Sequence, residues 1–235
     1  MAHEITRYSY NILFIVKKNQ IKMLKARGYT IQQDEEDMLH YTLDEFIRHS
    51  NEYLENNEDE TIYNMFSRVY TNGQGKELLV YYTNPLKSKS KKPKVGVKDL
   101  TSIVSIIEKE GIKNVIVLAP FNYSSTFISG IEKLKSYDIQ LFKYSELYIN
   151  PTEHYLVGKH RILTRDEAIN YLAKAKIKPS QLPKINDNDP VAKFYGAKPG
   201  DIIEIKREPV ISGNLVEDYI YHRLVKSSAV LHLPE

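Results

Sequence analysis

The sequence predicts an α/β unit over residues 1–149 and a small α+β unit over residues 150–235. Three observations carry this prediction. Between residues 97 and 144, helical and strand-like patterns alternate, as they do where helices pack on a sheet. After residue 152, short capped helices precede two strands. The segment Asn150–Thr152 separates these two textures and suits a linker.

The composition is that of a folded protein rather than a disordered chain, since 42% of the 235 residues are hydrophobic and 27% are charged. The net charge of +3 is too small to argue for nucleic-acid binding by itself. The absence of cysteine excludes disulfides, thiolate metal sites and a cysteine nucleophile. Because no signal-peptide core and no run of about 18 apolar residues occurs, we expect an intracellular, soluble protein with no membrane partner.

Two helices are predicted near the start of the chain. The first covers residues 5–27, where apolar side chains recur at helical intervals before Gly28, a residue that suits a left-handed cap. The second begins at Thr42, because Thr42 and Glu45 have the spacing of a capping box. Acidic and asparagine-rich residues from 53 to 60 then predict a solvated helix end and a loop.

A β-hairpin is predicted next. Its strands are the apolar runs Ile62–Tyr70 and Leu78–Thr83, and Asn72–Gly75 between them suits a tight turn. The following residues, 87–94, contain five lysines and no apolar side chain, and therefore predict an exposed loop.

Helix, strand, helix and strand complete the first unit. The first of these helices ends at Gly111. The strand Asn114–Ala119 is apolar on successive residues, so we expect it to be buried on both faces. A loop from Pro120 leads into a helix over residues 125–135, and Ile139–Tyr144 is the last predicted strand.

The second unit contains two predicted helices and two predicted strands. The run Thr164–Glu167 has a capping-box pattern and opens a helix that ends near Lys176. Asp189, with Pro190 at the first helical position, opens a shorter helix that Gly196 closes. The remaining segments are the irregular stretch Pro179–Pro183, the turn Lys198–Asp201, the strands Ile202–Arg207 and Tyr219–Val225, and the loop Ser212–Asn214 between these strands.

Several spaced motifs lie in this second unit. They are His154 with Leu156-Val157 and His160, then Ser180-Gln181-Leu182-Pro183, Asp189-Pro190-Val191-Ala192, Gly196 with Lys198 and Gly200, and Tyr221–Leu224. In this order they resemble the assembly domain of the fifth subunit shared by eukaryotic RNA polymerases I, II and III, a family that includes an archaeal counterpart. Several motifs in one order make a more specific signal than a single short motif.

The resemblance extends more weakly over the first unit, at Lys25–Tyr29 and Val95–Lys98. It implies a jaw domain over residues 1–149 that grips downstream duplex DNA, and an assembly domain over residues 150–235 that docks on the largest subunit, near the omega-like sixth subunit. It also implies a hetero-oligomer with one copy per polymerase, and no catalytic activity, cofactor or metal of its own. The docking residues that it implies are His154, His160, Gln181, Leu182, Pro183, Asp189, Pro190, Gly196, Gly200, Tyr221 and Arg223.

The family carries a Thr-Pro-Ser-Ala motif near downstream DNA, and the matching place here is Ser124–Phe127. The hydroxyls persist while the proline is lost. The candidate DNA-proximal residues are Asn122, Ser124, Ser125, Thr126, Lys87, Lys89, Lys91 and Lys92. Helix capping explains the serines equally well, and the lysines also suit a nuclear import signal or a solvated loop.

Two departures favour a divergent member of the family, of cellular or of large-DNA-virus origin. The lysine-rich loop resembles an insertion, and residues 227–235 extend past the family's usual end. The expected location is the nucleus for a cellular protein, and the virion or the host cytoplasm or nucleus for a viral one.

Two alternative functions remain open. Glu204 and Lys206 lie two apart on a predicted strand and therefore on one face, as in half of a metal-dependent nuclease motif. However, the chain has no Pro-Asp dipeptide to supply the other half, and no pair of histidines has the helical metal-binding spacing. The second alternative is a free DNA-binding transcription regulator that kept the assembly fold.

Overall fold

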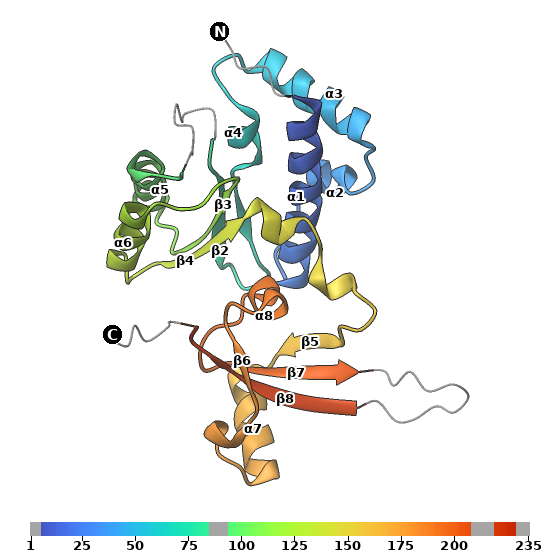
Figure 1. Cartoon of the computed structure of the whole chain (residues 1–235), viewed down its shortest axis with the longest axis vertical. Helices are drawn as coiled ribbons and strands as arrows, with labels where there is room; N and C mark the ends of the chain where they lie inside the picture. Colours follow the sequence, from blue (N-terminus) through green and yellow to red (C-terminus); the bar gives the residue numbers. More distant parts are fainter. Residues whose placement is uncertain (1–5, 85–93, 208–218, 229–235) are drawn as a thin grey trace, which may run out of the picture. The chain divides into compact units, whose positions relative to one another are not determined.

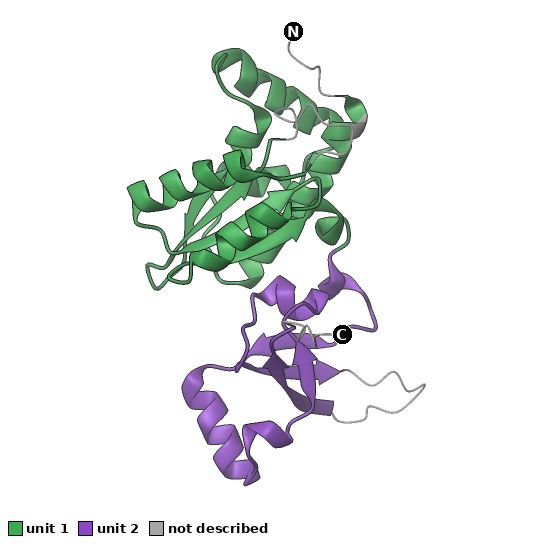
Figure 2. Cartoon of the chain, turned by 60° about the vertical axis from the view of Figure 1, so that its left-hand side comes forward, with its two compact units in different colours: residues 1–149 green, residues 150–235 purple. Residues whose placement is uncertain are grey.

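A computed structural model describes residues 6–84, 94–207 and 219–228 of this chain. The protein is a mixed α/β structure that divides into two compact units, Met1–Ile149 and Asn150–Glu235 (Figures 1 and 2). No helix within the described ranges is long and apolar enough to cross a membrane. The predicted loops at 87–94 and 212–214 lie outside the described residues, except for Lys94, so Lys87, Lys89, Lys91 and Lys92 lie outside them too.

The first unit is built on a four-stranded sheet with the order β1-β2-β3-β4. Its strands are β1 (Arg68–Thr71), β2 (Glu77–Tyr82), β3 (Asn114–Ala119) and β4 (Asp138–Lys143). The first two strands form the predicted antiparallel hairpin, and the remaining pairs are parallel. Residues 115–119 of β3 are all buried, which confirms that this strand is covered on both faces.

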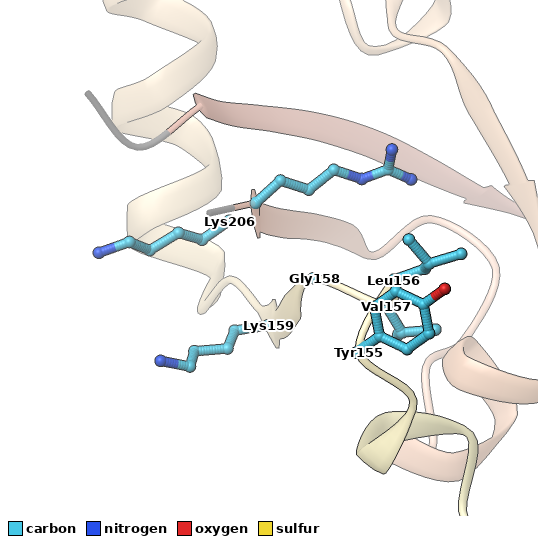
Figure 3. A pocket seen from close by; sticks show the side chains of 7 residues that line it. Tyr155, Leu156, Val157, Gly158, Lys159 and Lys206 are labelled. Atoms are coloured by element: carbon cyan, nitrogen blue, oxygen red, sulfur yellow. The ribbon is translucent and has the colours of Figure 1, made fainter. Parts of the chain in front are cut away.

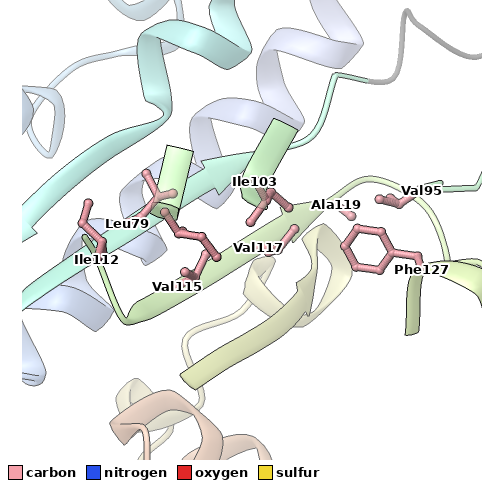
Figure 4. Packing of buried hydrophobic residues seen from close by; sticks show 9 residues of the cluster. Leu79, Val95, Ile103, Ile112, Val115, Val117, Ala119 and Phe127 are labelled. Atoms are coloured by element: carbon pink, nitrogen blue, oxygen red, sulfur yellow. The ribbon is translucent and has the colours of Figure 1, made fainter. Parts of the chain in front are cut away.

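Helices α5 (Val97–Glu110) and α6 (Ser125–Lys133) cover one face of this sheet (Figure 1). Helix α6 ends at Lys133, two residues before the predicted end. Between these helices and the sheet lies a close-packed apolar cluster (Figure 4). Its buried members are Leu79, Val95, Ile103, Ile107, Ile112, Val115, Val117, Ala119 and Phe127.

The other face of the sheet packs against the N-terminal helices. These are α1 (Arg7–Ala26), α2 (Gln33–Met38), α3 (Leu43–Asn56) and α4 (Ile62–Phe66). The capping box that opens α3 is present as predicted. Two predictions were wrong here. Helix α2 was not predicted, and the run predicted as one strand begins with α4, because the Thr61 hydroxyl accepts from the Asn64 N–H and turns the chain into a helix.

The second unit contains a sheet with the order β5-β7-β8-β6. Its strands are β5 (Lys159–Ile162), β6 (Lys184–Asn186), β7 (Ile202–Arg207) and β8 (Tyr219–Lys226). Helices α7 (Arg165–Ala175) and α8 (Pro190–Tyr195) pack on opposite faces, because α7 contacts the cluster of Ile202 and α8 that of Ile203, its neighbour along the strand. Short 3₁₀ helices cover Tyr144–Leu147, Pro151–Glu153 and Pro179–Gln181.

The caps of α7 and α8 are those predicted from the sequence. Strands β5 and β6 were not predicted, because each is short and mostly polar and forms only by pairing with a distant strand. The prediction of irregular chain at residues 179–183 was also wrong in part, since a 3₁₀ helix covers Pro179–Gln181. Helix α7 ends at Ala175, one residue before the predicted end, and β8 extends to Lys226, one residue past its predicted end.

Candidate docking surface and candidate nucleic-acid loop

Several of the docking residues implied by the resemblance hold the second unit together. Leu182 is buried in the core under α7. The Asp189 carboxylate accepts from the backbone N–H groups of Val191 (2.9 Å) and Ala192 (3.3 Å) and so caps α8, with Pro190 in the first turn. Any role of these residues in docking therefore acts through the surface that they shape.

Two glycines of the set occupy backbone conformations that favour glycine. Gly196 has φ 72° and ends α8, and Gly200 has φ 98° in the turn before β7. The Gly200 N–H donates to the Val225 carbonyl at 2.9 Å and ties this turn to β8. Both glycines thus set the path of the chain between α8 and the sheet.

Gln181 and Pro183 frame the entry to β6, and both are exposed. The Gln181 side-chain oxygen accepts from the Lys178 N–H at 2.7 Å, and the Pro183 carbonyl accepts from the Leu224 N–H at 2.9 Å. These contacts position the start of β6 beside β8 and leave the side chain of Pro183 toward solvent.

The segment from His154 to His160 forms a tight turn that leads into β5. The His154 carbonyl accepts from the Val157 N–H at 2.8 Å, and its Nδ1 accepts from the Leu156 N–H at 3.2 Å. His160 is half-buried, and its Nδ1 lies 2.6 Å from the Gly158 carbonyl, a geometry in which Nδ1–H donates. Burial lowers the pKa of His160, so this imidazole is neutral at pH 7.

Tyr221 and Arg223 lie on β8 on the face covered by α8. The Tyr221 ring lies between two guanidinium groups, those of Arg207 at 5.5 Å and Arg223 at 5.7 Å from its centre. Cation–π contacts of this kind orient both cations. The Arg223 Nε is buried and has no hydrogen-bond partner among the described residues.

A pocket of about 260 Å³ opens between the turn before β5 and the end of β7 (Figure 3). Its lining residues are Tyr155, Leu156, Val157, Gly158, Lys159, Lys206 and Arg207. Tyr155 is 83% exposed and Leu156 is 61% exposed. Of the lining, Tyr155, Lys159 and Arg207 were not among the candidate residues, because only the register of β5 on β7 brings them together.

Gly158 allows this close approach. A Cβ at this position would lie 2.5 Å from the Lys206 carbonyl oxygen and 2.9 Å from Arg207 Cγ. We expect Gly158→Ala to lower the free energy of unfolding by about 1–3 kcal/mol, because backbone must move to accept the methyl group. Chemical denaturation measures this, with Gly73→Ala as the control, since a Cβ there meets nothing within 4 Å. Equal stabilities for the two variants would contradict the prediction.

The candidate nucleic-acid loop connects β3 to α6. Ser124 is its N-cap, and its hydroxyl accepts from the Phe127 N–H at 3.2 Å. The loop is tied to the start of α5 through Val95, whose N–H donates to the Asn122 carbonyl and whose carbonyl accepts from the Ser124 N–H. The side chains of Asn122, Ser125 and Thr126 are exposed. A contact between this loop and DNA stays a prediction.

Glu204 and Lys206 lie on one face of β7, as the nuclease hypothesis requires. Glu204 is, however, already bonded across the sheet to Arg161 (3.1 Å) and lies 3.5 Å from His222. The described part of the chain contains no cluster of three His, Asp or Glu side chains that could hold a metal ion. The nuclease hypothesis therefore gains no support from the structure.

Comparisons with known proteins concern both units. Residues 149–225 match the family model described as RNA polymerase Rpb5, C-terminal domain. The chain is also similar to the subunit rpabc1 of DNA-directed RNA polymerases I, II, and III from Dictyostelium discoideum, with 29% identity over 219 residues that cover 91% of this chain and 97% of the relative. The subunit RPABC1 from Caenorhabditis briggsae is 28% identical over 215 residues, which cover 91% and 95%.

An archaeal relative is more similar over a shorter length. The DNA-directed RNA polymerase subunit Rpo5 from Sulfurisphaera tokodaii is 50% identical over 72 residues, which are 31% of this chain and 86% of the relative. Together with the match at residues 149–225, this coverage agrees with the resemblance carried by the motifs between His154 and Leu224. The chain therefore belongs to the family of the RNA polymerase subunit Rpb5.

Proposed function

We propose that the chain is a non-catalytic subunit of a multisubunit DNA-dependent RNA polymerase. The observation that carries this proposal is the similarity to polymerase subunits along 91% of the chain, through both compact units. The subunit would act in transcription, in a hetero-oligomer with one copy per polymerase. Relatives that serve polymerases I, II, and III support a nuclear location.

The two units have different roles in this proposal. The C-terminal unit is the assembly domain, which docks on the largest subunit near the omega-like sixth subunit. Exposed apolar side chains at Tyr155 and Leu156 support a binding surface there, since such side chains gather where proteins bind one another. The N-terminal unit is the jaw domain that grips downstream duplex DNA.

The grip on DNA would use the loop before α6. The exposed side chains of Asn122, Ser125 and Thr126 are hydrogen-bonding groups that can contact phosphate oxygens, and they lie beside the N-terminal ends of α5 and α6. Contacts of this kind position the duplex without reading its sequence. No observation favours the alternatives of a nuclease or a free regulator.

Affinity purification of the tagged full-length chain, followed by quantitative mass spectrometry, tests the proposal. We expect the two largest polymerase subunits to be recovered in near-equal molar amounts with the tagged chain. An unrelated tagged protein of similar size is the control for background. Abundant recovery of the tagged chain without either large subunit would sink the proposal.

A further inference from the structure

We propose that the surface of Tyr155, Leu156, Lys159, Lys206 and Arg207, here named the β5–β7 surface, binds an acidic segment of the largest polymerase subunit that inserts an apolar side chain into the pocket. This inference rests on the proposed function and deepens it, because it states the chemistry of the docking site. It moves the centre of docking away from residues that cap and fill the unit, such as Asp189 and Leu182.

The apolar part of the β5–β7 surface consists of two adjacent side chains that face solvent. Tyr155 and Leu156 are 83% and 61% exposed, although a turn can be built from polar residues. Burial of a Leu or Tyr side chain in an interface is a large source of binding energy, and aromatic anchors are enriched among the residues that dominate it.

The same patch continues on β8. Ile220 pairs with Lys206 and Tyr219 pairs with Arg207, and these two β8 side chains are 50% and 66% exposed. Exposed apolar side chains on two neighbouring segments make a continuous surface rather than isolated exceptions.

The basic part of the β5–β7 surface specifies the charge of the partner. Lys159 on β5 lies directly opposite Lys206 on β7, and like charges in that position destabilise a sheet. Arg207 adds a third cation, and the described residues that line the pocket include no carboxylate. Carboxylates supplied by a partner would relieve this repulsion.

The nearest acidic side chain on the same face of β7 is already engaged. Glu204 accepts from Arg161 at 3.1 and 3.2 Å, and Arg161 also donates to Glu167 at 2.6 Å. On the ladder, the pair of Arg161 and Glu204 lies two residues along from the pair of Lys159 and Lys206. Glu204 therefore belongs to a separate bonded group rather than to the β5–β7 surface.

The pocket is suited to a side chain of a protein. Its volume of about 260 Å³ is below the range of about 300–1,000 Å³ typical of small-molecule sites. Its wall is held by the β5–β7 ladder and by the contact of Gly158 with the Lys206 backbone (Figure 3). A preformed wall lowers the entropy that binding costs.

Binding of the full-length chain to polymerase core that lacks this subunit tests the inference. We expect Tyr155→Ala/Leu156→Ala to raise the Kd at least about 30-fold, as loss of an interface hot spot does. Both side chains are exposed, so the variant should unfold at the same denaturant concentration as the wild type. The control is Ile169→Ala, which removes an apolar side chain that is 55% exposed on α7.

The charge is tested by Lys159→Glu/Lys206→Glu against Lys174→Glu/Lys184→Glu, which makes the same change of charge at exposed sites on α7 and β6. We expect only the first pair to slow association and to abolish its acceleration at low salt. Carbodiimide cross-linking of the wild-type complex should join Lys159 or Lys206 to carboxylates of the largest subunit.

The outcomes separate the inference from the proposed function. If the wild-type chain fails to bind the core, the proposed function fails. If the wild type binds and the Tyr155→Ala/Leu156→Ala variant binds equally well, the inference alone is overturned. It is also overturned if the lysine pair changes affinity for DNA and leaves binding to the core unchanged, or if the cross-links reach only other subunits.

Discussion

Replacement of Glu35 by alanine is expected to lower the free energy of unfolding by about 3–5 kcal/mol, because it leaves a buried ammonium group without its counter-ion. Lys17 is 1% exposed and Glu35 is fully buried, and their charged atoms are 2.5 Å apart. The Tyr70 hydroxyl donates to the same carboxylate oxygen at 2.7 Å. Burial lowers the pKa of Lys17, and the Glu35 carboxylate acts in the opposite direction.

Aromatic rings complete the surroundings of this ion pair. The Lys17 Nζ lies 5.3 Å from the ring centre of Phe66, 5.9 Å from that of Tyr70 and 5.8 Å from that of Tyr82. These residues come from α1, α4, β1 and β2, so the pair lies where the N-terminal helices meet the sheet. Its loss should therefore destabilise the packing of the whole first unit.

Urea denaturation followed by circular dichroism measures the effect. The matched control is Glu36→Ala, which removes the carboxylate that pairs with Lys25 at 2.8 Å, where the side chains are 47% and 39% exposed. An exposed pair contributes about 0–1 kcal/mol. The double variant Lys17→Met/Glu35→Gln should recover part of the loss, since it removes both charges and keeps an acceptor for Tyr70. Equal stabilities of Glu35→Ala and Glu36→Ala would contradict the assigned role.

This ion pair could not be predicted from the sequence. Lysine and glutamate are ordinarily exposed, and nothing in the run around Glu35, which is acidic throughout, distinguishes one carboxylate as buried. The pairing joins α1 to α2, and α2 itself was not predicted. Only the packing of α1 against its neighbours determines which lysine turns inward.

Local signals, by contrast, were predictive. The caps at Thr42 and Thr164 and the N-cap at Asp189 depend on hydrogen bonds within three residues, so a short stretch of sequence contains all the information that they need. The helix at Ile62–Phe66 was mistaken for a strand, because aromatic and β-branched residues buried all round have no helical periodicity.

The candidate sites divide in the same way. The motifs that carry the family resemblance were found, and the structure shows that many of them are caps, turns or core, as at Leu182 and Gly196. The β5–β7 surface was not found as a surface, because it depends on β5, a strand of Lys, His, Arg and Ile that no periodicity predicts. Lys159 and Lys206 are far apart in the sequence and meet only through strand register.

Removal of residues 150–235 is expected to abolish incorporation of the chain into polymerase, whereas removal of residues 1–149 is expected to spare incorporation and weaken the grip on downstream DNA. Each unit has its own sheet and its own apolar clusters, so each deletion leaves one complete core. The resemblance adds that the archaeal form of the family consists of the second unit alone.

Incorporation is measured by co-purification with the largest subunit, and the grip on DNA by the lifetime of elongation complexes as salt is raised. If the first unit neutralises phosphates, its removal should shorten that lifetime and make it depend less steeply on salt, since fewer counter-ions are released. Ser125→Ala/Thr126→Ala in the full chain separates the loop from the rest of the first unit, because neither residue is the N-cap of α6. Equal loss of incorporation in both deletions would contradict the division of roles, because docking would then need both cores.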